Sequence, residues 1–552
     1  MRFREIFAVV AGIAVLLPAT LYPQGPPADI PALKASTELV LVPAVVTDKS
    51  GAHVAGLRKE DFVLKQDGKD KPIAVFEEVK TDTARLHRST GPTGTYSNVD
   101  ASGSAHHRLS IIVLDFVNTP FPDQANARAA LLKFLSQIAD SGEPMCLLAL
   151  TRNGLVLIHD FTDDPKDLAA ALRQAESNTA PLINQPQVEA GQFPGGGGLG
   201  FLTRIVRAQL EGEARMAAAE SKVAAAVTVE ALQQIAKAFR GLPGRKSLIW
   251  ASSGFPFSAS ALDDLSPGAP GAPSHDVYDN LWKLMNDAQI AIYSVDLRSV
   301  TSGVQSPGGV RPSDVGDVQF DTEMQEKEKM VETSSTLELF ADNTGGKAFL
   351  GGGNLAESFR QAVQDDSSYY MLGYYVSQRD TKPGWHPLSV GVHSKGSRLR
   401  YRKGFLLSHD STAPSARQEI RLALNSPLDF TGLPLAVSWT GTEPARTAGK
   451  TRVAFDLVMP PGFAAIDESD ENHLVVDIAV VARNAAGDVA ADSSQRIDVH
   501  LKGANLDQIQ HNGMTYRNGL QLPSGNYLVR FVVRDSLGNR TGSVAAPVTV
   551  KP

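Results

Sequence analysis

The chain has 552 residues, of which 42% are hydrophobic and 20% are charged. These are ordinary values for a globular protein and exclude a disordered or fibrous chain. At about 150 residues per domain, the length predicts three or four domains. The formal net charge of −7 provides no basic surface for nucleic acid or an anionic membrane. A single cysteine, Cys146, excludes a disulfide framework and cysteine-rich metal sites.

The N-terminal residues have the pattern of an export signal. Arg2 and Arg4 precede an apolar run over 6–17, which Pro18 ends. This run is shorter than a transmembrane helix and has the length of a signal-peptide core. We therefore expect residues 1–25 to be a signal peptide and the mature protein to be periplasmic, in the cell envelope or secreted, with no integral membrane span. The alternative is an uncleaved anchor.

Residues 36–80 are predicted to form an N-terminal β module of Ig-like type. The run from Leu39 to Thr47 is rich in β-branched residues, and turn-forming residues separate it from further short apolar runs. Residues 81–107 contain few large apolar side chains and many Ser, Thr and Gly, which predicts a linker.

From residue 108 to 376, strand-like runs alternate with helix-like stretches. Near-continuous apolar runs such as Ser110–Asp115, Ser247–Ala251 and Ile290–Asp296 are typical of strands covered on both faces. We therefore predict an α/β fold class: a doubly wound, mostly parallel sheet, flanked by the N-terminal β module and a C-terminal β-sandwich.

The C-terminal part of the chain has a β pattern. Residues 385–406 are predicted to form an appended β-hairpin, and residues 419–551 a β-sandwich domain of short strands separated by turns. An acidic run at 467–471 resembles a calcium ligand set in composition only. It lacks the glycine and the spacing of a calcium loop, so we interpret it as a solvent-exposed turn.

Oxygen-bearing side chains follow the predicted strands of the central region. Asp115 closes the first strand and is followed by Asn118 and Thr119, Thr179 is expected in a loop after a helix, and Ser253 follows the strand that ends near Ala251. In an open parallel sheet, ligands bind at the carboxyl ends of the strands. These side chains are therefore the candidate site.

The same residues carry a resemblance to a known family. Residues 115–119 (DFVNT) look like the D-x-S-x-S start of a von Willebrand factor A (VWA) domain. Residues 244–256 (GRKSLIWASSGFP) and 370–374 (YMLGY) resemble VWFA-related proteins seen in acidobacterial genomes, as do Asp61-Phe62 and Asp67-Gly68. The resemblance covers residues 38–406.

The resemblance implies a VWA-like domain whose upper face holds a divalent cation. Asp115, Thr119 and Thr179 match the family's metal positions, whereas Ser253 replaces an expected aspartate and Val117 replaces the first motif serine. Oxygen ligands of this kind suit Mg²⁺, and the missing carboxylate weakens the site. The alternative is that Asp115 and Thr119 only cap the loop and the helix that follows.

We therefore predict an exported, non-enzymatic bacterial protein of adhesion type. It would dock a protein partner, and no nucleic acid, on the upper face of the VWA-like domain, with or without metal. The alternatives are a hydrolase that uses Asp115 and Ser253 at the same edge, and a purely structural envelope protein. The hydrolase lacks a base, because His159 falls inside a predicted strand.

Overall fold

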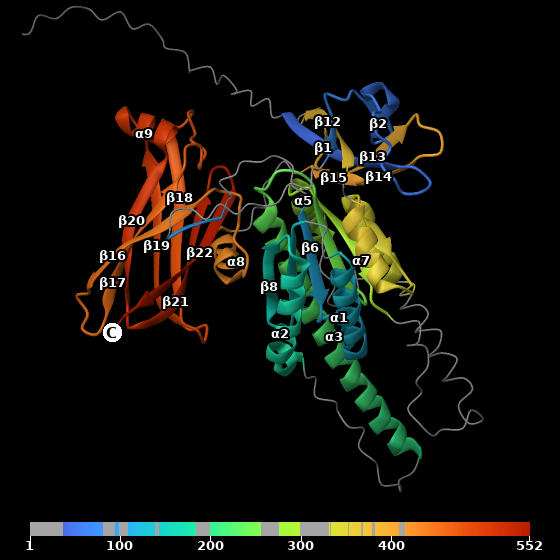
Figure 1. Cartoon of the computed structure of the whole chain (residues 1–552), viewed down its shortest axis with the longest axis horizontal. Coiled ribbons are helices and arrows are strands. Elements are labelled where there is room, and N and C mark those ends of the chain that lie inside the picture. The colour runs from blue at the N-terminus through green and yellow to red at the C-terminus, as the bar shows by residue number, and fades with distance from the viewer. Residues whose placement is uncertain are drawn as a thin grey trace, which may run out of the picture.

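The computed structural model describes residues 37–80, 94–98, 109–138, 143–183, 199–255, 275–298, 331, 333–351, 353–365, 368–377, 381–407 and 415–551. Figure 1 shows three groups of elements: a small β body, a central body of strands and helices, and a C-terminal body of long strands. The predicted signal peptide, 1–25, lies outside the described residues.

The prediction of a doubly wound, mostly parallel α/β fold class is wrong for this chain. The described residues are 45% strand and 28% helix. In the part of the chain that the structure describes, four of the five sheets are antiparallel and the remaining sheet is mixed. The apolar runs Ser110–Asp115, Ser247–Ala251 and Ile290–Asp296 belong to the mixed sheet. The strand over Ser368–Ser377 and the strands at both ends of the chain belong to the other four.

The small β body combines strands from both sides of the central region. Its first sheet has the order β14-β1-β12-β4 and its second the order β15-β13-β2-β3. The strands are β1 (Thr37–Thr47), β2 (Phe62–Gln66), β3 (Lys69–Lys71), β4 (Val75–Lys80), β12 (Ser368–Ser377), β13 (Gly384–Val392), β14 (Arg398–Tyr401) and β15 (Gly404–Leu407), and a short 3₁₀ turn, η1 (Lys59–Asp61), precedes β2.

The long-range pairing in this body changes the expected organisation of the chain. Strand β12, expected in the central sheet, instead pairs with β1 and β4. The strands predicted as an appended hairpin share their sheets with β1 and β2. A common core that includes Val42, Phe62 and Tyr370 joins them. The segments 36–80 and 385–406 therefore form one body and not two modules.

The central body is built on a six-stranded sheet of order β11-β10-β9-β6-β7-β8. Strands β6 to β11 pair in parallel except for β8, which runs antiparallel to β7 because only two residues separate the paired Thr151 and Gly154. The strands are β6 (Leu109–Asp115), β7 (Met145–Thr151), β8 (Gly154–Thr162), β9 (Lys246–Ser252), β10 (Ile290–Asp296) and β11 (Lys347–Phe349).

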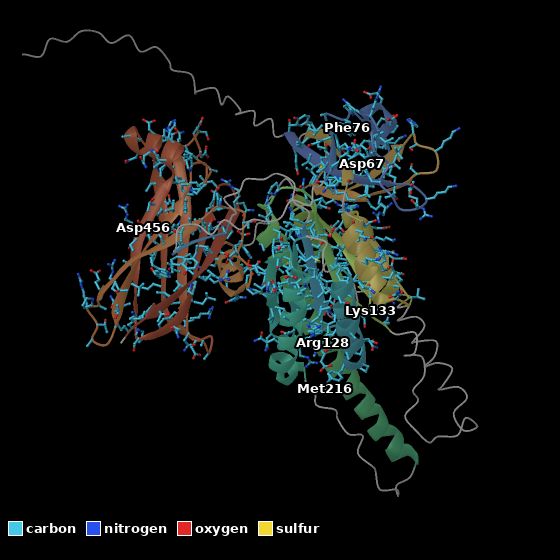
Figure 2. All side chains as sticks on the ribbon, in the orientation of Figure 1. Asp67, Phe76, Arg128, Lys133, Met216 and Asp456 are labelled. Carbon is cyan, nitrogen blue, oxygen red and sulfur yellow. The ribbon has the colours of Figure 1, made fainter. Side chains whose placement is uncertain are left out.

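Helices pack against both faces of this sheet and form two separate cores. One core joins α1 (Phe121–Gln137), α2 (Pro165–Ile183) and α7 (Leu355–Gln364) to the sheet. The other joins α3 (Leu199–Phe239), α5 (His275–Asp287) and the helical segment 333–344. Helix α1 illustrates the pattern, because it buries Ala127, Leu131 and Phe134 and leaves Lys133 exposed (Figure 2).

The C-terminal body is a sandwich of two antiparallel sheets, with the orders β20-β17-β16-β5 and β19-β18-β21-β22. Its elements are β5 (Thr95–Ser97), β16 (Ala436–Pro444), β17 (Thr451–Met459), β18 (His473–Arg483), β19 (Val489–His500), α9 (Ala504–Asn512), β20 (Met514–Leu522), β21 (Gly525–Asp535) and β22 (Arg540–Val550). Strand β5 lies within the predicted linker 81–107 and pairs with β16. Part of that segment is therefore an edge strand of the sandwich.

Helix α8 (Ala416–Asn425) joins the sandwich to the central body. Its Glu419 carboxylate, 3% exposed, lies 2.5 Å from Lys237 Nζ at the end of α3 and 2.7 Å from Arg534 Nε of β21. Thr431 adds a second link, because its hydroxyl donates to Ala238 O at 2.6 Å and accepts from Gly241 N at 3.0 Å. Buried charge pairs and hydrogen bonds of this kind fix the two bodies against each other.

Within the described residues, no helix has both the length and the apolar character that crossing a membrane requires.

Candidate functional site at the carboxyl edge of the mixed sheet

Asp115 lies at the carboxyl end of β6 with a fully buried side chain. Its Oδ1 accepts hydrogen bonds from the backbone N–H groups of Val117 (3.1 Å) and Asn118 (3.0 Å). Its Oδ2 accepts from Asn118 Nδ2 (2.8 Å), Ser252 Oγ (2.9 Å) and Trp250 Nε1 (3.2 Å). One carboxylate therefore ties the loop after β6 to the end of β9.

Two opposing effects act on the ionisation of this group. Burial raises the pKa of Asp115, and the hydrogen bonds from Asn118, Ser252 and Trp250 lower it without cancelling the effect of burial. The five donors also use the acceptor capacity of the carboxylate, which offers about four lone-pair sites. A metal ion would therefore bind Asp115 only in exchange for one of these hydrogen bonds.

The other predicted residues of the upper face form a neighbouring group. The backbone N–H of Ser253 donates to Thr119 Oγ1 at 3.1 Å, and the Ser253 hydroxyl donates to Asp123 Oδ2 at 3.3 Å. Thr119, Asp123 and Ser253 are each at most 9% exposed. The structure therefore brings Asp115, Thr119 and Ser253 to one edge, as the strand ends predict, but as a closed hydrogen-bonded cluster.

Thr179 does not lie where the sequence analysis placed it. It falls within helix α2 and not in a loop after that helix, because the helix continues to Ile183. Its side chain lies outside the described residues. A magnesium site at this edge would therefore need Asp115 to release a hydrogen bond, and Asp115, Thr119 and Ser253 do not fit such a site as they stand.

A second buried carboxylate, that of Asp296, lies at the end of β10 on the same edge of the sheet. Asp296 ends β10 and accepts from Arg298 at both oxygens, from Nε at 2.8 Å and from Nη2 at 2.7 Å. Arg298 also donates to Ser334 Oγ at 2.8 Å. This bidentate pair, with a carboxylate only 3% exposed, fixes the segment after β10 in the same way that Asp115 fixes the segment after β6.

Apolar side chains are exposed around this polar cluster. Phe121, the first residue of α1, is 68% exposed and lies two residues after Thr119. Leu350, which follows β11, is 38% exposed, and Val331, close in sequence to Ser334, is 66% exposed. The carboxyl edge therefore combines a rigid polar interior with exposed apolar groups.

The described residues offer little support for hydrolysis at this edge. The hydroxyl of Ser252 bonds to Asp115 and to the Gly254 carbonyl, and that of Ser253 bonds to Asp123, so neither has an imidazole partner. His159 lies in β8, where its Nδ1 is 2.6 Å from the carbonyl oxygen of Asp160. Burial raises the pKa of the Cys146 thiol, which disfavours the reactive thiolate.

Two cavities lie elsewhere in the described part of the chain. One, of about 190 Å³, lies where Lys237 and Arg240 meet Glu419 and Arg540 of the sandwich junction. The other, of about 300 Å³, has Gln289 in its lining, immediately before β10, and therefore lies toward the amino end of the parallel strands. Neither belongs to the predicted site.

Some residues of the site were not predicted as such. Trp250 is opposite Val113 in the paired strands β9 and β6, and this pairing carries its indole to Asp115. Asp123, in the first turn of α1, accepts a hydrogen bond from the Ser253 hydroxyl. The sequence feature that could have indicated these residues is the pair of strand ends at β6 and β9, because neighbouring parallel strands place their terminal side chains together.

The sequence matches no protein-family model, and no curated protein matches it. Among solved structures, the TFIIH p34 N-terminal domain is 12% identical, with a TM-score of 0.22, and covers 46% of this chain and 96% of its own. Three N-terminal domains of the type V pili tip protein Mfa5 from Porphyromonas gingivalis are 9% identical, with a TM-score of 0.24. The match covers 86% of this chain and 96% of the Mfa5 chain. TM-scores this low carry no argument, so the resemblance to VWFA-related proteins stays a prediction.

Proposed function

We propose that the chain is a non-enzymatic binding protein that docks a protein partner on the carboxyl edge of the mixed sheet. The observation that carries this proposal is the exposure of Phe121, at 68%, beside the closed cluster of Asp115, Thr119 and Ser253. Aromatic side chains exposed on a rigid support are typical anchors of protein interfaces.

The loop that carries Phe121 is held in place from both ends. Asp115 accepts from two backbone N–H groups of the loop, and Gln124 of α1 donates to Phe116 O at 3.2 Å and to Thr119 O at 2.7 Å. A preorganised loop loses little conformational entropy when a partner binds. This rigidity supports docking by Phe121 without a large rearrangement.

The chemistry of the edge also favours binding over catalysis. Its hydroxyl and carboxylate groups are buried and bonded to one another, whereas Phe121 and Leu350 are exposed. This supports a metal-independent surface, and it makes the interaction insensitive to chelators.

A capture experiment tests the proposal. Purified chain is immobilised as wild type, Phe121→Asp and Val489→Asp, where Val489 is a control apolar residue that is 52% exposed on the sandwich. We expect an envelope protein to be retained by the wild type and by Val489→Asp, with and without EDTA, and lost with Phe121→Asp. Equal retention by all three proteins would contradict docking at this edge.

We also propose that the chain is exported, on the basis of the basic, apolar and proline pattern of residues 1–25. N-terminal sequencing of chain recovered from the envelope or the medium tests this proposal. A new N-terminus near residue 26 supports it, and an intact Met1 in a cytoplasmic pool contradicts it.

A further inference from the structure

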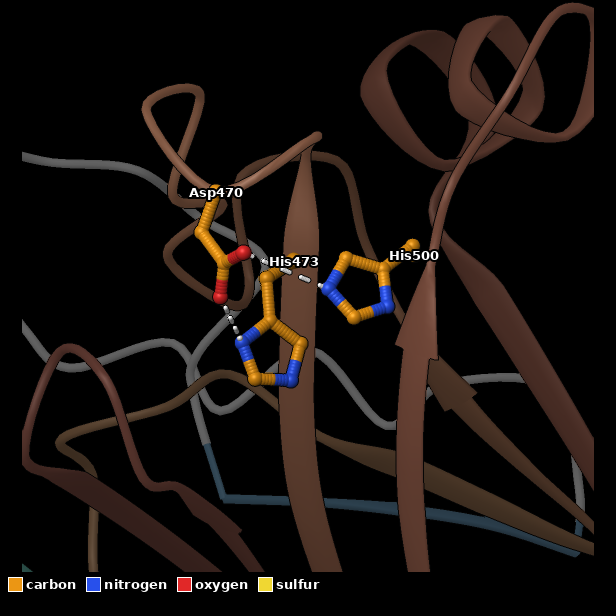
Figure 3. Close-up of side chains that lie close together, drawn as sticks. All are labelled: Asp470, His473 and His500. Atoms are coloured by element: carbon orange, nitrogen blue, oxygen red, sulfur yellow. Dashed lines mark ion pairs between the residues drawn. The ribbon is translucent and has the colours of Figure 1, made fainter.

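Three potential metal ligands meet at one end of the C-terminal sandwich, far from the cluster around Asp115. His473 is the first residue of β18 and His500 the last of β19, and the two are directly opposite in the paired strands. Asp470 lies in the turn that precedes β18. Figure 3 shows its carboxylate facing both imidazoles.

Backbone hydrogen bonds hold Asp470 in this position. The N–H of His473 donates to the carbonyl oxygens of Asp470 (2.9 Å) and Asp467 (3.1 Å), and the N–H of Asp467 donates back to His473 O at 2.9 Å. The N–H of Leu501 donates to Asn472 O at 3.1 Å and closes the turn against the end of β19. The turn is therefore folded back onto the two strand ends.

The side chains are arranged around a common point. Asp470 Oδ2 lies 3.0 Å from His473 Nδ1, and Asp470 Oδ1 lies 3.5 Å from His500 Nε2. The two rings are stacked, with centroids 4.6 Å apart and planes inclined by 10°. One ligand atom from each of the three residues lies within 4.8 Å of the others, so small side-chain rotations bring all three to one ion.

The orientation of His473 is fixed from its far side. Its Nε2 lies 2.8 Å from Asp498 Oδ1, the partner to which an Nε2–H donates. Nδ1 faces the Asp470 carboxylate at 3.0 Å, so a metal ion that binds both groups takes the place of the proton between them. A carboxylate behind a histidine in this way orients metal-binding imidazoles and increases their basicity.

We propose that Asp470, His473 and His500 bind one zinc-type divalent metal ion, with Asp498 as the positioning residue behind His473. Two imidazoles and one carboxylate suit zinc, and water completes the coordination. Mg²⁺ and Ca²⁺ prefer shells made of oxygen ligands, so they are excluded as occupants. The side chains of Asp470, His473 and His500 are 59%, 20% and 46% exposed, which leaves an open path for the ion.

The test is calorimetric titration of the full chain, free of any histidine tag, with Zn²⁺, Mg²⁺ and Ca²⁺. We expect the wild type to bind one Zn²⁺ at this site and to give no heat with Mg²⁺ or Ca²⁺. His500→Ala and the near-isosteric Asp470→Asn should each weaken this binding at least tenfold. Asp498→Asn should weaken it about 10- to 100-fold, as expected for a residue behind a ligand.

A matched control separates this site from other histidines. His393 is exposed and lies in the small β body, so His393→Ala should leave the zinc titration unchanged. A thermal melt of each variant without zinc checks that the sandwich is intact. The proposal is overturned if the wild type binds no Zn²⁺, or if His500→Ala and Asp470→Asn, folded as the wild type, bind Zn²⁺ as tightly as the wild type does.

Discussion

Trp250 donates its indole N–H to Oδ2 of Asp115 across 3.2 Å, and this bond links the ends of the neighbouring strands β9 and β6. The same oxygen accepts from Ser252 and Asn118, so one buried carboxylate joins the loop before α1 to the end of β9. Asp115 therefore holds the carboxyl edge of the mixed sheet in place through its hydrogen bonds. In the proposed function, the partner contacts the exposed residues of this edge and not Asp115 itself.

Removing this acceptor should destabilise the chain. Asp115→Ala removes the acceptor of the Trp250 indole N–H and of one Asn118 amide N–H, while Ser252 keeps the Gly254 carbonyl, and we expect a loss of about 3 kcal/mol in the free energy of unfolding. Urea denaturation measures it. The exposed control Asp492→Ala should change the value by less than about 0.5 kcal/mol. A stable Asp115→Ala chain would show that the network contributes little.

Magnesium should leave the stability of the wild type unchanged. Both oxygens of Asp115 accept hydrogen bonds, and an ion that does not bind the folded chain cannot stabilise it. The measurement is the Tm with millimolar Mg²⁺ and with EDTA. A rise in Tm that Ser253→Ala abolishes would show instead that the cluster opens to hold the ion.

The junction between the sandwich and the central body should weaken in acid. Burial pushes the pKa of Glu419 upward, but Lys237 and Arg534 outweigh it and hold that pKa below its ordinary value of 4.5. The unfolded chain therefore binds the proton more readily than the folded chain does. The stabilisation from Glu419 is present above about pH 4.5 and is lost as the pH falls through the folded pKa.

The pH dependence is isolated by comparing variants. We expect the free energy of unfolding of Glu419→Gln to fall less steeply than that of the wild type below about pH 4.5. Glu443→Gln serves as the control, because Glu443 is 60% exposed in its ion pair with Arg452. Parallel curves for the wild type and Glu419→Gln would refute the assignment.

The same junction depends on a close approach of two backbones. A Cβ at Gly241 would lie 1.8 Å from the carbonyl oxygen of Thr431, so Gly241→Ala must displace the sandwich from the end of α3. We expect a destabilisation of about 1–3 kcal/mol. Gly391→Ala is the control, because its nearest contact would be Val63 Cβ at 3.9 Å. Equal denaturation midpoints for the two variants would contradict this account.

The sequence supports the individual strands better than their assembly. The apolar runs Ser110–Asp115, Ser247–Ala251 and Ile290–Asp296 are strands, because a continuous apolar run is buried on both faces. Tyr370–Val376 is also a strand, but it pairs with β1, more than 300 residues away in the sequence. Local patterns carry no information about such a partner, and the predicted fold class was wrong for this reason.

The pairing of His473 with His500 could not be predicted from the sequence because of an irregularity in the strand register. The turn at 484–488 indicates a hairpin, but the register shifts between Ala482 and Arg483. Counting outward from the turn without that bulge places His473 opposite Val499 and not opposite His500. A one-residue shift moves a side chain to the other face of a strand, so the pairing of the two histidines follows only from the structure.

Site-specific photocrosslinking in the cells that make the protein tests the docking surface most directly. Benzoylphenylalanine is introduced in place of Phe121, Leu350 or, as the control, Val489, which are all exposed apolar positions. Docking at the carboxyl edge predicts the same discrete protein adduct from positions 121 and 350 and none from position 489. Adducts of equal yield from all three positions, or no adduct from position 121, would contradict it.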